Sequence, residues 1–159
     1  MQRLTLTAAV TVLLTATISS ALAQMPISKE KTVIHSVAYP NRVKVTRAIY
    51  HIGVQVGAIP LSEIRVKVPE NAPAQIRFGQ ATVTDTTGKT LNANTSLSEK
   101  EVAIAFAPSI AAGETIEIDL NNVRTSDLIG RTWLFPIYGK TIGSAQEIPL
   151  GTARIQTYQ

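Results

Sequence analysis

The chain has 159 residues, of which 45% are hydrophobic and 16% are charged, and it carries a formal net charge of +4 without any cysteine. This length suits one ordinary domain, and the composition excludes an intrinsically disordered chain, a collagen and a coiled coil. Without cysteine there are no disulfides and no thiolate-bound metals, so stability must come from a hydrophobic core and backbone hydrogen bonds.

Residues 1–23 have the three zones of a secretory signal sequence. Arg3 gives the positive start, residues 4–18 are apolar, and small residues follow. The small-x-small pattern at 21–23 predicts cleavage between Ala23 and Gln24. Because the apolar stretch is shorter than the ~20 residues that span a bilayer, we expect no transmembrane segment after cleavage. The protein is thus predicted to be exported to the periplasm or cell exterior, with the thylakoid lumen as an open alternative.

The remainder, residues 24–159, is predicted to be one β domain. Apolar and charged residues alternate strictly over 62–68, and the same period of two returns at 75–78, 81–85, 101–106 and 115–120. Turns rich in Pro, Gly and Asn separate these segments. Short strands with one wet face predict an all-β fold, an antiparallel β-sandwich that is immunoglobulin-like in its broad architecture.

Three stretches depart from simple alternation. Within 42–56 the parity of the apolar residues changes, which predicts a bulge or a strand end near 46–48. The polar segment 92–100 is expected to be a loop. Pro136 cannot donate a backbone hydrogen bond, so its segment is predicted to be an edge strand or to be kinked there.

Several strand-and-turn segments together resemble a known family. They are Ala48-Ile49-Tyr50, Leu61-Ser62-Glu63-Ile64, Val102-Ala103-Ile104-Ala105-Phe106-Ala107-Pro108, Ala111-Ala112-Gly113-Glu114-Thr115 and Leu150-Gly151-Thr152-Ala153-Arg154-Ile155. Their order over residues 35–158 resembles the uncharacterised secreted family called domain of unknown function 2808, found mainly in cyanobacteria. The resemblance implies an exported β-rich protein and brings no functional residues to this chain.

The chain shows no motif of an enzyme or of a cofactor site. Its histidines are His35 and His51, and no serine lies in a Gly-x-Ser-x-Gly turn. His51 has the parity opposite to the apolar residues of its strand, which predicts a solvent-facing side chain. We therefore expect no catalysis, no cofactor and no metal, although imidazoles suit copper or zinc and these two histidines are the candidates for such a site.

Acidic residues alternate along one predicted strand. Glu117 and Asp119 share its wet face, and Glu99 and Glu101 would lie nearby if a hairpin around Gly113 paired the two strands. Such a cluster could supply the paired carboxylates of a glycosidase. Alternating acids on an exposed strand are also a common solubility device, which is the interpretation we favour.

Basic residues dominate the first half of the mature chain. Arg42 and Lys44 share one strand face, and Arg65 and Lys67 share another, so the four would form a cationic patch if their strands lay in one sheet. A patch of this kind attracts anionic polymers, lipid headgroups or an acidic protein. Nucleic acid is not an expected partner, because no recognition helix or aromatic platform accompanies the basic residues.

The segment 131–139 gathers several aromatic side chains. Trp133 and Tyr138 could stack on a sugar from an exposed strand, or Trp133 could point into the core with Tyr138 at its rim. From these features we predict an exported, non-catalytic interaction or structural module of the envelope. The alternative is a periplasmic carrier of a small ligand or of a metal such as copper.

Overall fold

The structure is a computed structural model, and it describes residues 32–72, 76–125 and 129–159. The predicted signal sequence, with its cleavage between Ala23 and Gln24, lies outside these residues. Within the described part of the chain, no helix is long and apolar enough to cross a membrane.

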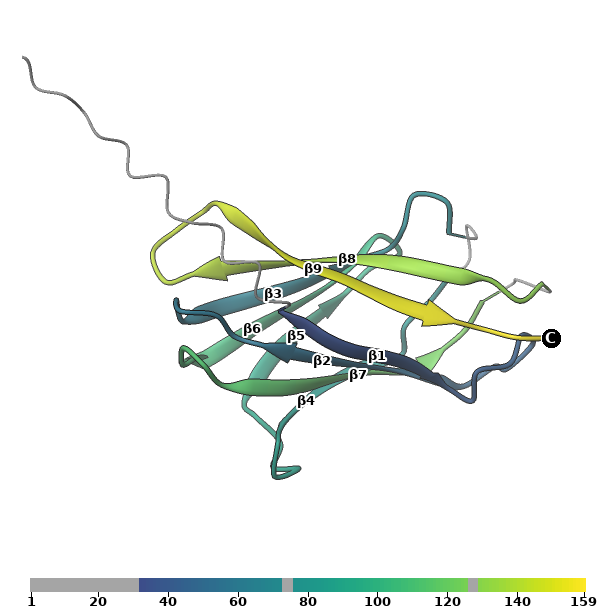
Figure 1. Ribbon diagram of the computed structural model, residues 1–159, viewed down its shortest axis with the longest axis horizontal. Coiled ribbons are helices and arrows are strands. Elements are labelled where there is room, and N and C mark those ends of the chain that lie inside the picture. The colour runs from purple at the N-terminus through teal and green to yellow at the C-terminus, as the bar shows by residue number, and fades with distance from the viewer. Residues whose placement is uncertain (1–31, 73–75, 126–128) are drawn as a thin grey trace, which may run out of the picture.

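The described residues form two antiparallel β-sheets that pack face to face (Figure 1). The first sheet has the order β1 (Val33–Tyr39), β2 (Ala48–Gln55), β7 (Thr115–Val123) and β4 (Gln80–Asp85). The second sheet has the order β5 (Ala93–Leu97), β6 (Glu101–Ile110), β3 (Leu61–Lys67), β8 (Thr132–Thr141) and β9 (Glu147–Gln156). The predicted antiparallel sandwich of immunoglobulin-like architecture is confirmed.

The core lies between the two sheets and is built from the alternating apolar residues of their inner faces. Ile64 and Val66 of β3 are fully buried, whereas Arg65 between them faces outward. Phe135 of β8 joins the sheets, because its ring meets the edge of Tyr50 from β2 with 5.8 Å between ring centroids. The period-two pattern therefore identifies the buried faces of β3, β4, β6 and β7 correctly.

The two sheets are also joined along one edge, where β1 lies beside β9. The Ser36 hydroxyl donates to the Arg154 carbonyl at 2.9 Å and accepts from the Arg154 amide at 2.8 Å. Further along, an isolated parallel bridge joins Arg42 to Tyr158. The C-terminus is thereby held next to the connection between β1 and β2.

Two local predictions were wrong. The segment 92–100 contains β5, an outer strand that pairs with β6 and whose mostly polar side chains are exposed, so it lacks an apolar alternation. Of the two expectations for the strand that holds Pro136, the edge strand is wrong, because β8 lies between β3 and β9. Close to Pro136, however, the register of β8 against β9 shifts between Ile137 and Tyr138. The paired residues of β8 and β3 end at Ile137, and Pro136 is the next residue outside this pairing. The hydrogen bonds between β8 and β3 therefore do not need the backbone N–H that Pro136 lacks. The predicted strand end near 46–48 is confirmed, since β2 begins at Ala48.

Candidate functional site

One end of the sandwich brings together chain segments that are far apart in the sequence. The end of β1 pairs with the start of β2, which pairs with the end of β7, which in turn pairs with the start of β4. In the second sheet, the start of β8 pairs with the end of β9 at the same end of the molecule. The C-terminus also lies there, at the right in Figure 1.

The charged residues in the connections at this end are mostly basic, and we call it the basic end. Its basic side chains are all exposed, and they are Arg42, Lys44, Arg47, Arg77, Lys100, Arg124 and Arg131. The acidic residues described in the same connections are Glu70 and Glu99. At the opposite end, the described connections carry only Lys89 and Glu114 as charged residues. The fold therefore separates charge along its long axis.

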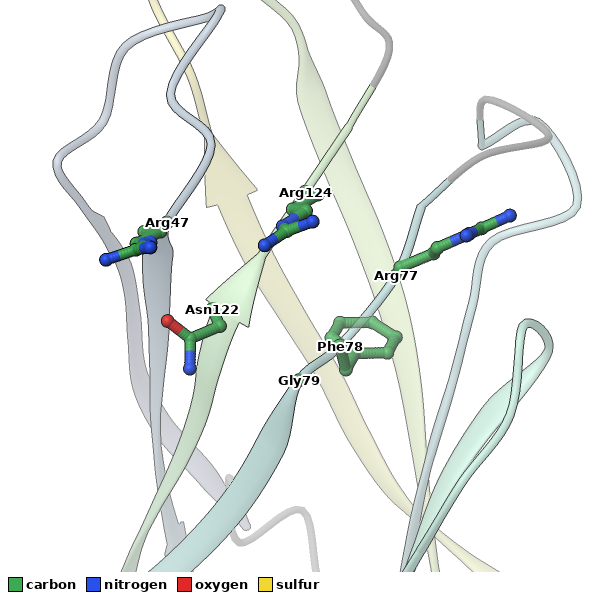
Figure 2. A pocket seen from close by; sticks show the side chains of 6 residues that line it. All are labelled: Arg47, Arg77, Phe78, Gly79, Asn122 and Arg124. Carbon is green, nitrogen blue, oxygen red and sulfur yellow. The ribbon is translucent and has the colours of Figure 1, made fainter.

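An open cleft of about 470 Å³ lies at the basic end, where β2, β7 and β4 of the first sheet meet (Figure 2). Figure 2 shows Arg47 and Arg124 on either side of Asn122, while Arg77 projects from beyond Phe78. These side chains come from the start of β2, the end of β7 and the segment before β4. The cleft thus exists only once those three strands are paired.

A bulge in β7 shapes the floor of this cleft. The register of β2 against β7 shifts between Ala48 and Tyr50, and Asn122 in the shifted part has φ of 52°. Asparagine tolerates this left-handed conformation better than most residues. A Cβ atom on Gly79 would lie 2.7 Å from the Asn122 Cβ, so glycine is needed for the close approach of the two segments.

The positive charges of the arginines in the cleft are only weakly compensated by carboxylates. Arg77 Nη2 lies 4.0 Å from Glu99 Oε1, but both side chains are about 70% exposed, so this pair binds weakly. Among the residues that the structure describes, Arg47 and Arg124 form no salt bridge. The three arginines of the cleft could not be recognised as a group in the sequence, because they become neighbours only through the strand order.

The predicted four-residue patch of Arg42, Lys44, Arg65 and Lys67 does not form. Arg42 and Lys44 lie in the connection between β1 and β2, at the basic end. Arg65 and Lys67 lie instead on the outer face of the second sheet.

Carboxylates neutralise Arg65, Lys67 and Lys140 on that outer face. Arg65 forms ion pairs with Glu63, Glu101 and Glu147. The Lys67 ammonium donates to Glu147 Oε2 at 2.8 Å. On the other side, the Lys140 ammonium donates to Glu63 Oε2 at 3.3 Å. We call this group the outer-face network. Because its positive and negative side chains alternate, it produces little net electrostatic potential that could attract a charged ligand.

The hydrogen bond between Lys67 and Glu147 predicts a specific pH dependence of stability. It raises the pKa of Lys67 and lowers the pKa of Glu147. The contribution of Glu147 is therefore present above its ordinary pKa of about 4.3 and is lost as the pH falls through its lowered value. The contribution of Lys67 is complete below its ordinary pKa of about 10.4 and is lost only above it, at its raised value.

Replacing Glu147 with glutamine should lower the free energy of unfolding at neutral pH. Urea unfolding from pH 2 to 9 should show a constant difference from the wild type above about pH 5 that shrinks in acid. Glu114→Gln, which changes an exposed glutamate, serves as the control. An undiminished difference at pH 2 would show that Glu147 acts through packing and not through its charge.

Trp133 and Tyr138 do not form an exposed sugar-stacking surface. Trp133 is only 3% exposed and packs in the core, as the second sequence interpretation holds. Tyr138 is half-buried, and the Lys67 ammonium lies 4.4 Å from the centroid of its ring. The aromatic segment 131–139 thus contributes mainly to the core and to the outer-face network.

The two histidines, which are distant in the sequence, lie side by side on the outer face of the first sheet. Their rings stack with 5.2 Å between centroids. Glu117 Oε2 lies 3.0 Å from His35 Nε2 and 3.2 Å from His51 Nε2. His51 Nδ1 also forms a hydrogen bond of 2.6 Å with Asp119 Oδ1. His51 therefore faces outward as predicted, but in contact with two carboxylates.

The predicted grouping of Glu117 and Asp119 with Glu99 and Glu101 was wrong. The chain around Gly113 does not form a hairpin, because β6 belongs to the second sheet and β7 to the first. Glu101 joins the outer-face network and Glu99 lies near Arg77, whereas Glu117 and Asp119 meet the histidines. The pair of carboxylates on β7 is thus part of a histidine cluster.

Solved structures similar to this chain include two that are described as adhesins of Staphylococcus aureus. The collagen adhesin of S. aureus has a TM-score of 0.47 and 6% identity, with 83% of this chain and 50% of that chain covered. The collagen-binding domain of a Staphylococcus aureus adhesin has a TM-score of 0.44 and 6% identity, with 72% of this chain and 89% of that one covered. This chain therefore spans about half the length of the first of these structures.

The N-terminal domain of PorA is a more distant likeness, with a TM-score of 0.35, 13% identity, and 78% of this chain and 84% of that one covered. No curated protein matches the chain. The family model described as Protein of unknown function (DUF2808) matches residues 24–156, and the chain therefore belongs to this family.

Proposed function

We propose that this chain is an exported, non-catalytic module that docks on an anionic surface through its basic end. The observation that carries the proposal is the separation of charge: exposed arginines and lysines crowd one end of the sandwich, while the cations of the outer-face network are neutralised. A surface with one dominant sign of charge attracts ligands of the opposite sign and orients their approach.

The cleft gives this end a preferred point of contact. Arg47 and Arg124 flank Asn122, so two guanidinium groups and one amide are available to an anionic group that enters between them (Figure 2). Guanidinium groups bind carboxylates and phosphates through paired hydrogen bonds. The cleft is open and lined by three arginines, which favours the headgroups of an extended anionic surface over an enclosed small molecule.

Vesicles of phosphatidylglycerol, compared with neutral phosphatidylcholine vesicles, test the proposal. A basic residue near an anionic membrane contributes about 1 kcal/mol, and reversing a charge counts as two such changes. Arg124→Glu and Arg47→Glu should therefore each weaken binding to the anionic vesicles roughly 30-fold. Binding of the wild type should also weaken steeply as salt is added.

Lys89→Glu is the matched control, since it changes the net charge equally at the opposite end of the sandwich. At physiological salt it should weaken binding by less than about threefold, because the screening length is then about 8 Å and Lys89 lies at the end of the sandwich away from the bound surface. Equal losses in all three variants would mean that only net charge matters. Failure of the wild type to bind anionic vesicles at low salt would refute the proposal for lipid surfaces.

A further inference from the structure

The histidine cluster on the first sheet has a layout that the strand register imposes. His35 of β1 lies opposite Gly53 of β2, and Gly53 lies opposite Glu117 of β7, so the three form one row across the sheet. A Cβ atom on Gly53 would overlap the His35 imidazole. Because Gly53 has no side chain, the His35 ring can lie across β2 and reach Glu117.

Glu117 holds an oxygen whose surroundings are unusual. Its Oε2 atom is buried and has no hydrogen-bond donor among the described residues, although two imidazole nitrogens lie at 3.0 and 3.2 Å. Neither nitrogen meets it with hydrogen-bond geometry. A buried carboxylate oxygen without a donor is costly, and some positive group is needed to compensate it.

The neighbouring Asp119 shows which ring nitrogen of His51 carries a proton. His51 Nδ1 lies 2.6 Å from Asp119 Oδ1, so Nδ1 carries the proton and donates it to the carboxylate. In the neutral ring, Nε2 then carries a lone pair and no proton, 3.2 Å from Glu117 Oε2. Two acceptors 3.2 Å apart repel each other unless a cation shares them. That cation is either a second proton on the ring or a metal ion.

The spacing of the candidate ligand atoms fits a shared metal ion. Ligands about 2.0–2.1 Å from a tetrahedral ion lie roughly 3.3 Å apart, and about 2.9 Å apart at right angles. The two distances from Glu117 Oε2 to the imidazole nitrogens fall in this interval. All three ligand atoms lie within 4.8 Å of one another, so a small rotation of the rings would complete the set.

We propose that His35, His51 and Glu117 bind one late first-row divalent ion of the zinc and copper class. Two neutral imidazoles and a carboxylate suit these metals better than Mg²⁺ or Ca²⁺, which prefer ligand sets made only of oxygen. Asp119 is a positioning residue, which fixes the tautomer of His51 from outside the ligand set. The site is independent of the basic end, because it lies on the outer face of the first sheet.

The ion would remain accessible from solvent. The side chains of His35 and His51 are 46% and 35% exposed, so the three protein ligands leave one side of the ion open. Structural zinc sites are closed by four protein ligands, whereas an open position allows exchange of the ion or binding of a further ligand. The arrangement therefore favours reversible loading of the metal over a permanent structural role.

Calorimetric titration of the untagged protein with ZnCl₂ and CuCl₂ at pH 7 tests this proposal. One ion should bind per chain, and MgCl₂ and CaCl₂ should give no comparable binding. Glu117→Gln should weaken the affinity at least tenfold, and Asp119→Asn should weaken it about 10- to 100-fold through the loss of orientation. Glu114→Gln, a charge-matched change outside the site, should leave it unchanged.

Electron paramagnetic resonance of the Cu²⁺-loaded protein supplies a readout that a change in stability alone would not move. The wild type should show two nitrogen ligands, and His35→Gln or His51→Gln should each show one. If a histidine variant does not fold, Glu117→Asp, which keeps the charge but shortens the side chain, takes its place in the titration. Equal affinities of the wild type, Glu117→Gln and His35→Gln would overturn the proposal and leave the cluster as protonated ion pairs.

Discussion

Replacing Phe135 with alanine is expected to lower the free energy of unfolding by about 3–5 kcal/mol. The ring is 1% exposed and contacts the edges of Tyr50 and Phe78, with centroid separations of 5.8 and 6.4 Å. Its removal leaves a cavity where the second sheet packs on the first, and the surrounding backbone is held in two hydrogen-bonded ladders that cannot collapse into it. Since whole domains are stable by only about 5–15 kcal/mol, this variant should be near the limit of folding.

Urea unfolding followed by the fluorescence of the single tryptophan, Trp133, measures this loss. Leu134→Ala is the matched control, because Leu134 is the next residue on the same strand but faces outward and is 54% exposed. Its cost should stay near 0.5 kcal/mol. Comparable losses in the two variants would contradict the assignment of the inner and outer faces of β8.

Replacing Arg65 with alanine is expected to cost about 1–3 kcal/mol, the second largest effect on stability. The guanidinium contacts Glu63, Glu101 and Glu147, and its removal leaves three carboxylates close together on a partly buried sheet face. Lys140 and Lys67 still pair with two of them, and solvent screens the rest, which keeps the cost below that of a fully buried ion pair.

The stability of the same variant should depend on pH in a defined way. Its deficit relative to the wild type should shrink in acid, as the pH falls through the lowered pKa of Glu147 and its charge is lost in both proteins. Arg65→Lys should be intermediate, because a lysine keeps the charge but cannot contact several carboxylates in one plane. A deficit that is the same at pH 3 and pH 7 would show that Arg65 stabilises the sheet through its alkyl chain alone.

The strands with one solvent-exposed and one buried face could be predicted from the sequence, whereas the order of the strands in the sheets could not. The alternation around Ile64 and Ile118 identifies β3 and β7 because each has one buried and one solvated face. The outer strand β5 has few apolar residues to reveal it. Likewise, nothing in the turn around Gly113 shows that the chain leaves one sheet there and enters the other, since a hairpin and a crossover use similar turn residues.

Both candidate sites depend on that unpredicted strand order. His51 and Asp119 are directly opposite in the register of β2 against β7, and their common outward parity was the available signal. This shared parity indicates a contact between the two side chains only when β2 and β7 are known to be neighbouring strands. Arg47 and Arg124 are likewise far apart in the sequence and come together only through the strand order. A search for runs of basic residues therefore finds Arg65 and Lys67, whose charges are neutralised, and overlooks the basic end.

Fractionation of cells that produce the untagged protein, with and without a high-salt wash, tests the proposed docking most directly. We predict that the wild type sediments with the envelope at low salt and is released by high salt, since contacts through exposed arginines are screened. Arg124→Glu should be largely soluble already at low salt, whereas Lys89→Glu should sediment like the wild type. A wild-type protein that is fully soluble at low salt would contradict the account.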